Sequence, residues 1–399
     1  MKIYPIYTFD SNLVIKKESR FFRYYKDLNL IERFKICLVE CYLDFINYSL
    51  LFISRLVFKS FKDENFKNIL IYRTGSMGDI VAALSAIKKI RVLYPNAKLT
   101  VLTAAEKKGY VTFDLVAGRN LYDAIIDYTG RNIFSFSPAI KKNFDLIIEL
   151  PQPSISLFKN LKNIFYFRFV CQIKHGFGWQ VSVPFFLNKS IERSVLYKTE
   201  SAILNQIIDR NCPNKIKEEI ELNITPSDKI KVENLIKNNN IKAPFNIIII
   251  GSNDLKNRWS FKNFLEISKS EFLNHGLQTL IVGGEADKDI LEGYVLPEYV
   301  LNMCGSTNIG QSAYLISLAN CIYTNDTGSM HLANAVGTRI NAFFSCKDFP
   351  GRWFPSLDKA TVFRSQNIPC SICLTNKQCE NNFCLEHISA TIVLNKFND

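Results

Sequence analysis

Short apolar runs recur along most of this chain, and each is followed by a polar turn and then by apolar residues at helical spacing. One run covers residues 68–73, and the segment after its turn keeps its apolar side chains on one helix face up to Pro95. The alternation continues from 68 to 180 and returns from 246 to 345. This pattern predicts parallel sheets whose strands are connected by crossover helices.

A polar, asparagine-rich stretch at residues 225–245 separates the two alternating regions. A chain of 399 residues also exceeds the usual size of a single hydrophobic core, so two domains are expected. We predict a helical N-terminal extension over residues 1–67, a first α/β domain over 68–240 and a second over 241–399.

Two of the predicted strand–turn–helix units carry turns suited to a ligand. Residues 74–79 form the first turn and contain two glycines, and residues 325–328 form the second. The amides at a helix start lack internal partners and carry partial positive charge, so such turns bind phosphate in many folds. Each turn taken alone is equally consistent with an ordinary helix cap.

The two motifs in this order resemble those of a known family. A Gly-Asp pair at 78–79, and the motif Asp-Thr-Gly-x-x-His-Leu at 326–332, resemble glycosyltransferase family 9, the heptosyltransferases of lipopolysaccharide assembly. The resemblance spans residues 68–397 and leaves out residues 1–67. It implies an α/β fold of the GT-B type, in which two doubly wound parallel-sheet domains face a cleft.

The resemblance also implies a reaction and its participants. Members of the family are inverting enzymes that move a heptose from an ADP-linked donor to the inner core of lipopolysaccharide. The first domain would then bind an anionic lipid-linked glycan acceptor, and the second a nucleotide-diphosphate sugar. No cofactor and no catalytic metal are expected, because a helix N-terminus and cationic side chains stabilise a diphosphate.

Individual residues take roles from the same resemblance. Asp79 corresponds to the general base that takes the proton of the acceptor hydroxyl, although a carboxylate there also complements the helix dipole. The acceptor-side turn contains Gly75, Ser76 and Gly78. The predicted donor-binding residues are Asp326, Thr327, Gly328, Ser329, His331, Arg258, Lys256 and Glu285.

One part of the donor motif departs from the family pattern. The family places a cation just before a Trp-Pro pair, whereas Asn257 stands here where lysine is common, and Ser260 replaces the proline. Arg258 or Lys256 is expected to supply the charge, and Ser260 is predicted to cap the following helix. The departure leaves open a degenerate member that binds a nucleotide without turnover, and a relative with another nucleotide sugar or glycan acceptor.

The net charge of +12 is concentrated in the first domain. Residues 68–244 hold 25 lysines and arginines against 15 aspartates and glutamates, whereas residues 245–399 hold 12 against 14. A basic acceptor domain suits an anionic acceptor at a membrane surface, although a composition biased to lysine and asparagine gives the same excess. No DNA- or RNA-binding motif accompanies the charge, so nucleic acid is not an expected partner.

Residues 18–62 lie outside the resemblance and allow two interpretations. Large apolar residues alternate there with charged ones, and the longest uncharged run, residues 45–54, is too short for a bilayer. The segment is expected either to pack on the first domain or to lie in a membrane interface as an amphipathic helix. No secretory signal is recognised, so a cytoplasmic protein, peripheral on the inner face of the inner membrane, is predicted.

Eleven cysteines without a secretory signal indicate a reducing compartment. Four of them form a C-x2-C-x5-C-x4-C pattern, namely Cys370, Cys373, Cys379 and Cys384. This spacing is consistent both with zinc binding and with a purely structural tail.

Overall fold

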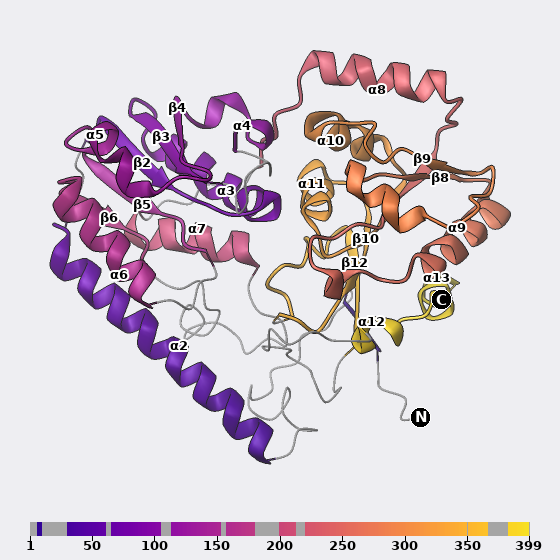
Figure 1. The fold of residues 1–399 in the computed structure, drawn as a ribbon, viewed down its shortest axis with the longest axis horizontal. Helices are drawn as coiled ribbons and strands as arrows, with labels where there is room; N and C mark the ends of the chain where they lie inside the picture. The colour runs from indigo at the N-terminus through magenta and orange to yellow at the C-terminus, as the bar shows by residue number, and fades with distance from the viewer. Residues whose placement is uncertain are drawn as a thin grey trace. The chain divides into compact units, whose positions relative to one another are not determined.

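Two separate parallel sheets carry the fold, one in each of two α/β units (Figure 1). The computed structural model describes residues 6–9, 30–60, 65–104, 113–152, 157–179, 199–212, 220–348, 350–365 and 382–398. The N-terminal unit consists of residues 17–194 and 198–223. The C-terminal unit consists of residues 224–399 together with 1–16 and 195–197.

The sheet of the N-terminal unit has five parallel strands in the order β4-β3-β2-β5-β6. Its strands are β2 (Asn68–Tyr72), β3 (Lys98–Thr103), β4 (Ala124–Asp127), β5 (Leu146–Glu149) and β6 (His175–Phe177). The central strands consist largely of isoleucine, leucine and valine that are buried throughout. Strands of this composition are typical of a parallel sheet covered by helices on both faces.

Helices surround this sheet, and α7 packs on α3 while α2 packs on α6 and β6. Their bounds are α2 (Leu30–Val57), α3 (Met77–Leu93), α4 (Phe113–Val116), α5 (Ser137–Ile140), α6 (Leu157–Phe165) and α7 (Glu200–Asn211), with the π-helical turn η3 (Tyr166–Val170) and the 3-10 turns η1 (Arg119–Leu121) and η2 (Ile133–Phe136). Helix α3 ends just before Pro95, as predicted. No helix in the described ranges combines the length and the apolar character needed to cross a bilayer.

The sheet of the C-terminal unit has seven strands in the order β1-β12-β11-β10-β7-β8-β9. Its strands are β1 (Ile6–Phe9), β7 (Phe245–Ile249), β8 (Gln278–Ile281), β9 (Val300–Asn302), β10 (Cys321–Asn325), β11 (Ile340–Phe344) and β12 (Ala360–Ser365). All neighbours are parallel except β1, which pairs antiparallel with β12. No strand was predicted before residue 68, so β1 is an addition from the start of the chain.

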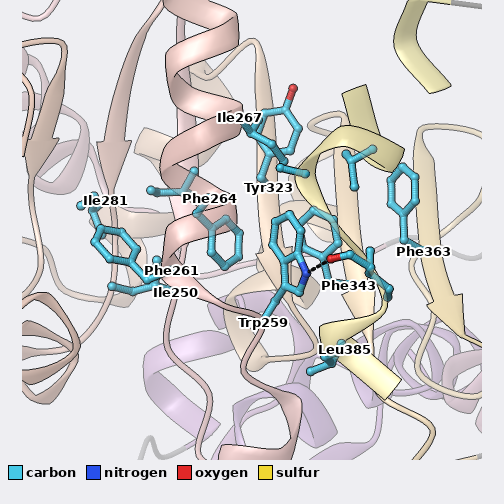
Figure 2. Close-up of a cluster of buried hydrophobic side chains, with 14 of the residues drawn as sticks. Ile250, Trp259, Phe261, Phe264, Ile267, Ile281, Tyr323, Phe343, Phe363 and Leu385 are labelled. Carbon is cyan, nitrogen blue, oxygen red and sulfur yellow. Dashed lines mark hydrogen bonds between the residues drawn. The ribbon is translucent and has the colours of Figure 1, made fainter. Parts of the chain in front are cut away.

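The helices of this unit enclose a core of aromatic side chains around Trp259. The elements are α8 (Pro226–Asn238), η5 (Leu255–Asn257), α9 (Phe261–His275), η6 (Glu285–Leu291), α10 (Ile309–Leu318), α11 (Gly328–Val336), α12 (Phe383–Glu386) and α13 (Ala390–Asn398). The Trp259 indole stacks on Phe343 with ring centroids 3.7 Å apart, and its Nε1 donates to the Ile388 oxygen at 2.6 Å (Figure 2). This packing fixes the loop before α9.

Each sheet reverses its strand order beside its first parallel strand. In the N-terminal unit β2 lies between β3 and β5, and in the C-terminal unit β7 lies between β8 and β10. Doubly wound sheets bind ligands beyond the carboxyl ends of the strands at such a reversal. The turns after β2 and β10 are therefore the places to look for a site.

Candidate functional site

The turn after β10 presents backbone donors. Strand β10 ends at Asn325, and α11 begins at Gly328 after the N-cap residue Thr327. Within the described part of the chain no acceptor meets the amides of Gly328 and Ser329, and the Thr327 hydroxyl makes no capping bond. These donors lie at a strand end beside the reversal of strand order, where an anion is favoured.

Asp326 lies in the same turn and carries a carboxyl of altered acidity. Its backbone oxygen accepts from Ser252 Oγ at 3.3 Å, and its Oδ2 accepts from Nδ2 of Asn257 at 3.3 Å. Burial, and then the carboxylate of Asp348, raise the pKa of Asp326 to about 7 against the opposing charge of Lys347. Near neutral pH the carboxyl is therefore partly protonated, which lessens its repulsion of a diphosphate.

Asn257, the departure from the family pattern, is buried between two partners. Its Nδ2 donates to Asp326, and its Oδ1 accepts from Ser345 Oγ at 2.6 Å. A neutral amide thus occupies the position where a lysine is common. Arg258 is tied to the neighbouring turn, since its Nε donates to the Ser252 oxygen at 2.9 Å, and the half-buried Lys256 precedes it by two residues.

Asn325 joins the turn after β10 to the loop before α9. Its Oδ1 accepts from the Trp259 amide at 2.8 Å, and its Nδ2 donates to the Ile250 oxygen at 2.8 Å. The buried Trp259 therefore positions the segment that carries Lys256 and Arg258. Ser260 takes the N-cap position of α9 as predicted, although its side chain makes no capping bond.

Two further residues that were predicted to bind the donor, His331 and Glu285, also have contacts within the protein. His331, in the first turn of α11, is buried with its ring edge-on to Trp353 at a centroid distance of 5.9 Å. Glu285, at the start of η6, accepts from Lys288 Nζ at 2.6 Å. It also lies against Gly305, where a Cβ would stand 1.9 Å from its Oε2. A role of either residue in donor binding stays a prediction.

Asp287 is a residue that the sequence did not single out. Its Oδ2 accepts from the Gly284 amide at 2.8 Å. A Cβ on Gly251 or Gly283 would stand 2.1 or 2.4 Å from its carboxylate, so the glycines after β7 and β8 pack directly on this side chain. Gly251 and Gly283 are conspicuous in the sequence because each follows a predicted strand. Their contact with Asp287 is not, because it depends on the fold of the turn after β8.

Asp79 lies at the third position of α3 and caps that helix. Its Oδ2 accepts from the amide and from the hydroxyl of Ser76, both at 2.8 Å, and its side chain keeps 16% exposure. Gly75 has φ of +129°, and a Cβ there would stand 2.6 Å from Asp79 Oδ2. Gly78 is buried within the first turn. The structure thus brings all four acceptor-side residues into one turn after β2.

Arg73 is a buried cation beneath that turn and was also missed. Its Nη2 lies 3.5 Å from Asp79 Oδ1, and its Nη1 lies 3.6 Å from Glu200 Oε1. The same Nη1 donates to the oxygens of Leu150 and Pro151 at 3.2 and 2.6 Å. Arg73 therefore joins the carboxyl ends of β2 and β5. In the sequence, the only local sign of Arg73 is that a charged residue directly follows the apolar strand β2.

Glu149 ends β5 and is buried among few polar partners. No hydrogen bond reaches its Oε2 within the described residues. Burial raises its pKa to about 8, although the charges of Lys159 and Arg73 oppose this shift. The carboxyl is therefore mostly neutral at pH 7, beside the sheet end that carries Asp79. In the sequence it was indistinguishable from any acidic residue closing a strand.

The cysteine pattern falls mostly outside the described residues, since Cys370, Cys373 and Cys379 all lie there. Cys384 is buried, and its Sγ accepts from the Cys346 amide at 3.4 Å. In the ranges that the structure describes, no cluster of three or more histidine, cysteine, aspartate or glutamate side chains is arranged to hold a metal ion. The zinc interpretation stays untested.

Comparison of the sequence with known proteins agrees on one kind of enzyme. The model of glycosyltransferase family 9 (heptosyltransferase) matches residues 134–383. Lipooligosaccharide heptosyltransferase 2 of Haemophilus influenzae is 22% identical over 333 residues, which cover 74% of this chain and 88% of that protein. Lipopolysaccharide heptosyltransferase 2 of Escherichia coli is 30% identical over 115 residues, which cover 27% of this chain and 32% of that protein.

Solved structures share the fold. A family 9 glycosyltransferase of Veillonella parvula matches with a TM-score of 0.60 and 16% identity, over 84% of this chain and 97% of its own. The ADP-heptose lipopolysaccharide heptosyltransferase II of Escherichia coli matches with a TM-score of 0.57 and 18% identity, over 83% of this chain and 97% of its own. The predicted α/β fold of the GT-B type, with two doubly wound parallel sheets, is confirmed.

Proposed function

Since this chain belongs to glycosyltransferase family 9, the heptosyltransferases, it is a glycosyltransferase, and we propose that it moves a heptose from ADP-heptose to the inner core of a lipopolysaccharide acceptor. The names of the similar proteins support the heptose and the acceptor, because they are lipooligosaccharide and lipopolysaccharide heptosyltransferases, and one solved structure with this fold is named for ADP-heptose. An acceptor of this kind is an anionic lipid-linked glycan. The enzyme would therefore act at the cytoplasmic face of the inner membrane.

The strongest support for a nucleotide-diphosphate donor is the turn after β10. The amides of Gly328 and Ser329 offer donors at a helix N-terminus, and the Thr327 hydroxyl adds a third. Asp326, with its pKa raised to about 7, gives up part of its negative charge beside these donors. Arg258 and Lys256 supply the positive charge for the leaving group in this proposal.

In the proposed reaction, an acceptor hydroxyl attacks the anomeric carbon of the heptose and gives its proton to Asp79. The bond from that carbon to the phosphate oxygen breaks, and its electron pair leaves with ADP. The two bonds from Ser76 occupy Asp79 Oδ2, so Oδ1 is the oxygen that takes the proton. Arg73 lies 3.5 Å from Oδ1 and donates through Nη2 to the Asp79 backbone oxygen at 2.9 Å, so it holds this residue in place.

A donor panel with the purified full-length protein tests the proposal. ADP-heptose, ADP-hexoses and sugars linked to UDP or GDP are offered with a lipopolysaccharide acceptor truncated at the inner core. Release of ADP together with a mass increase of one heptose on the acceptor is the expected result. Use of a different donor would favour a relative with another sugar. Binding of ADP-heptose without turnover on any acceptor would overturn the proposal.

A further inference from the structure

In the part of α2 whose side chains are described, from residue 42 on, two apolar faces are present, and the described residues cover one of them. Ile46, Leu50 and Ser54 are buried where α2 packs on α6 and β6. A second stripe recurs every three or four positions, and its members are between 51% and 69% exposed: Tyr42, Phe45, Tyr48, Phe52 and Leu56. A helix that only packs on a domain turns polar residues outward, so this stripe marks an interaction surface.

Exposed aromatic residues continue on the element beside α2. Helix α6 lies along α2 in Figure 1, and η3 extends it. Phe158, Phe165 and Phe169 are exposed there, and the rings of Phe165 and Phe169 stack with centroids 5.7 Å apart. Exposed aromatic side chains are therefore found on two elements of this unit.

A cationic pocket of about 730 Å³ lies next to the end of α2. Its basic lining residues are Lys67, Lys142, Arg168 and Lys174, and Asp145 is the one carboxylate among the lining residues that the structure describes. Arg168 connects the pocket to α2, because its Nε donates to the Val57 oxygen at 2.9 Å. Asp145 Oδ2 is engaged by the amides of Lys67 and Asn68, both at 2.9 Å. Among the described residues, the three lysines and Arg168 form no ion pair.

This pocket is separate from the turn that carries Asp79. Its lining residues lie just before β2, β5 and β6 or, in the case of His175, at the start of β6, so the pocket lies at the amino ends of the strands. Asp79 follows β2 and lies at the opposite, carboxyl end of the sheet. The pocket is therefore not the acceptor turn described above, and an anion held in it would leave that turn open.

We propose that the α2 stripe, the exposed phenylalanines of α6 and η3, and the cationic pocket together attach the protein to an anionic lipid bilayer. The stripe enters the boundary between headgroups and acyl chains, and the pocket holds a lipid phosphate. Among the described residues, these four cations have no carboxylate partner. Their charge therefore favours a bilayer that carries phosphates over a protein partner with a neutral, apolar surface. The inference rests on the proposed function only in that a lipid-linked acceptor would lie in the same membrane.

Sedimentation of the full-length protein with vesicles tests this attachment. The protein should bind vesicles of phosphatidylcholine and phosphatidylglycerol, and high salt should weaken the binding. Phe45→Ser with Phe52→Ser should lower the partition coefficient by about tenfold or more. Lys142→Glu with Lys174→Glu should lower it by roughly 25-fold or more, since each lost lysine removes up to about fivefold and the new carboxylates are repelled by the anionic surface.

Matched controls lie on α9 of the other unit, where Leu273, Lys262 and Lys269 are exposed. Leu273→Ser, and Lys262→Glu with Lys269→Glu, should bind vesicles like the wild type. Turnover on a deacylated, water-soluble acceptor should be normal in every variant, so loss of attachment is separated from failure of the proposed transfer.

Several outcomes would overturn the attachment. One is a wild-type protein that does not bind anionic vesicles, and another is binding that the α2 and pocket variants leave unchanged. A third is a dimer that Phe45→Ser dissociates in analytical ultracentrifugation while vesicle binding is absent. In that case the stripe is an interface between copies of this chain.

Discussion

The side-chain amide of Asn257 donates to Oδ2 of Asp326 at 3.3 Å, and the same asparagine accepts from Ser345 Oγ at 2.6 Å. A lysine at position 257 would bring a full charge to this carboxylate and hold it ionised. The neutral amide does not, and the pKa of Asp326 is raised to about 7. In this chain, pH therefore sets the charge next to the proposed diphosphate site.

ADP binding should weaken as pH rises through this range. Between pH 6 and 8 Asp326 loses its proton, and its new charge should lower the ADP affinity by about three- to tenfold. Asp326→Asn removes this titration. Its ADP affinity, measured by calorimetry at the same pH values, retains only the effect of the titration of ADP itself and can be subtracted from that of the wild type. Asn257→Lys should flatten the profile too, because the carboxylate is then ionised and paired at both pH values. Equal slopes in wild type and Asp326→Asn would exclude the effect.

Asp79→Asn should lower turnover by about 10² or more, because an amide does not accept the acceptor's proton. Asparagine keeps an oxygen for the two bonds from Ser76, so folding and ADP affinity should be unchanged. Asp228→Asn is the matched control, since Asp228 Oδ2 caps α8 through the amide and hydroxyl of Thr225 at 3.0 and 2.6 Å. If steady-state kinetics show the same turnover in both variants, Asp79 is a capping residue and nothing more.

Thr327→Val combined with Gly328→Ala should weaken ADP binding by about tenfold. The Thr327 hydroxyl donor is lost, and the new methyl group at position 328 hinders the approach of a phosphate to the backbone amides. Ser260→Ala is a suitable control, since Ser260 also occupies an N-cap position but makes no capping bond. Titration calorimetry distinguishes the two variants. Unchanged ADP affinity in the double variant would mean that the nucleotide binds elsewhere.

Gly75→Ala should abolish most of the activity. Its Cβ would stand 2.1 Å from Gln152 Nε2 and 2.6 Å from Asp79 Oδ2, so the carboxylate has to move. Gly276→Ala provides the comparison, because Gly276 has φ of +67° but no atom within 4 Å of its missing Cβ. Both variants should lose about 1–2 kcal/mol of stability to backbone strain, and only Gly75→Ala should also lose turnover. Paired melting curves and kcat values measure this difference.

Glu149 should make the protein less stable as pH rises. Its pKa is raised to about 8 in the folded chain, whereas an unfolded glutamate ionises near 4.3. Between these values the folded state holds a proton that the unfolded state lacks. Stability contributed by this group is therefore full below the unfolded pKa and is lost as pH approaches 8, by up to about 1.4 kcal/mol per pH unit.

Glu149→Gln cannot titrate and should remove that slope. Urea unfolding of wild type and variant at several values between pH 5 and 8.5 gives the comparison, and the difference between the two curves isolates Glu149 from other groups. The free energy of unfolding of the variant should exceed that of the wild type by the largest amount at the alkaline end of this range. A constant difference across the whole range would show that Glu149 is not protonated in the folded state.

The sequence was sufficient for the elements whose signal is local. Strands β2 and β7 were predicted because they are apolar runs beside glycine turns, and the turns after β2 and β10 were predicted from motifs. Arg73 and Glu149 were missed because their importance depends on which strand ends meet in the sheet. No periodicity along the chain carries that information.

Strand β1 escaped for a related reason, whereas α2 lies in the segment that was predicted to be helical. Four residues near the start form a strand only because β12 offers an edge for pairing. Packing on the first domain and lying in a membrane interface are alternatives in the sequence, whereas the described part of α2 is packed on one face and exposed on another. A pattern of apolar residues all round a helix does not say which of them its own domain covers.

The pairing of β1 with β12 imposes an order on the synthesis of the protein. Residues 6–9 leave the ribosome before the other strands of this sheet, and their partner strand follows about 350 residues later. At about 5–20 residues per second, the partner arrives roughly 20 to 70 seconds afterwards. The nascent chain therefore carries an unpaired strand while the residues between β1 and β12 are made, and the C-terminal sheet gains this edge only after its other strands have been synthesised.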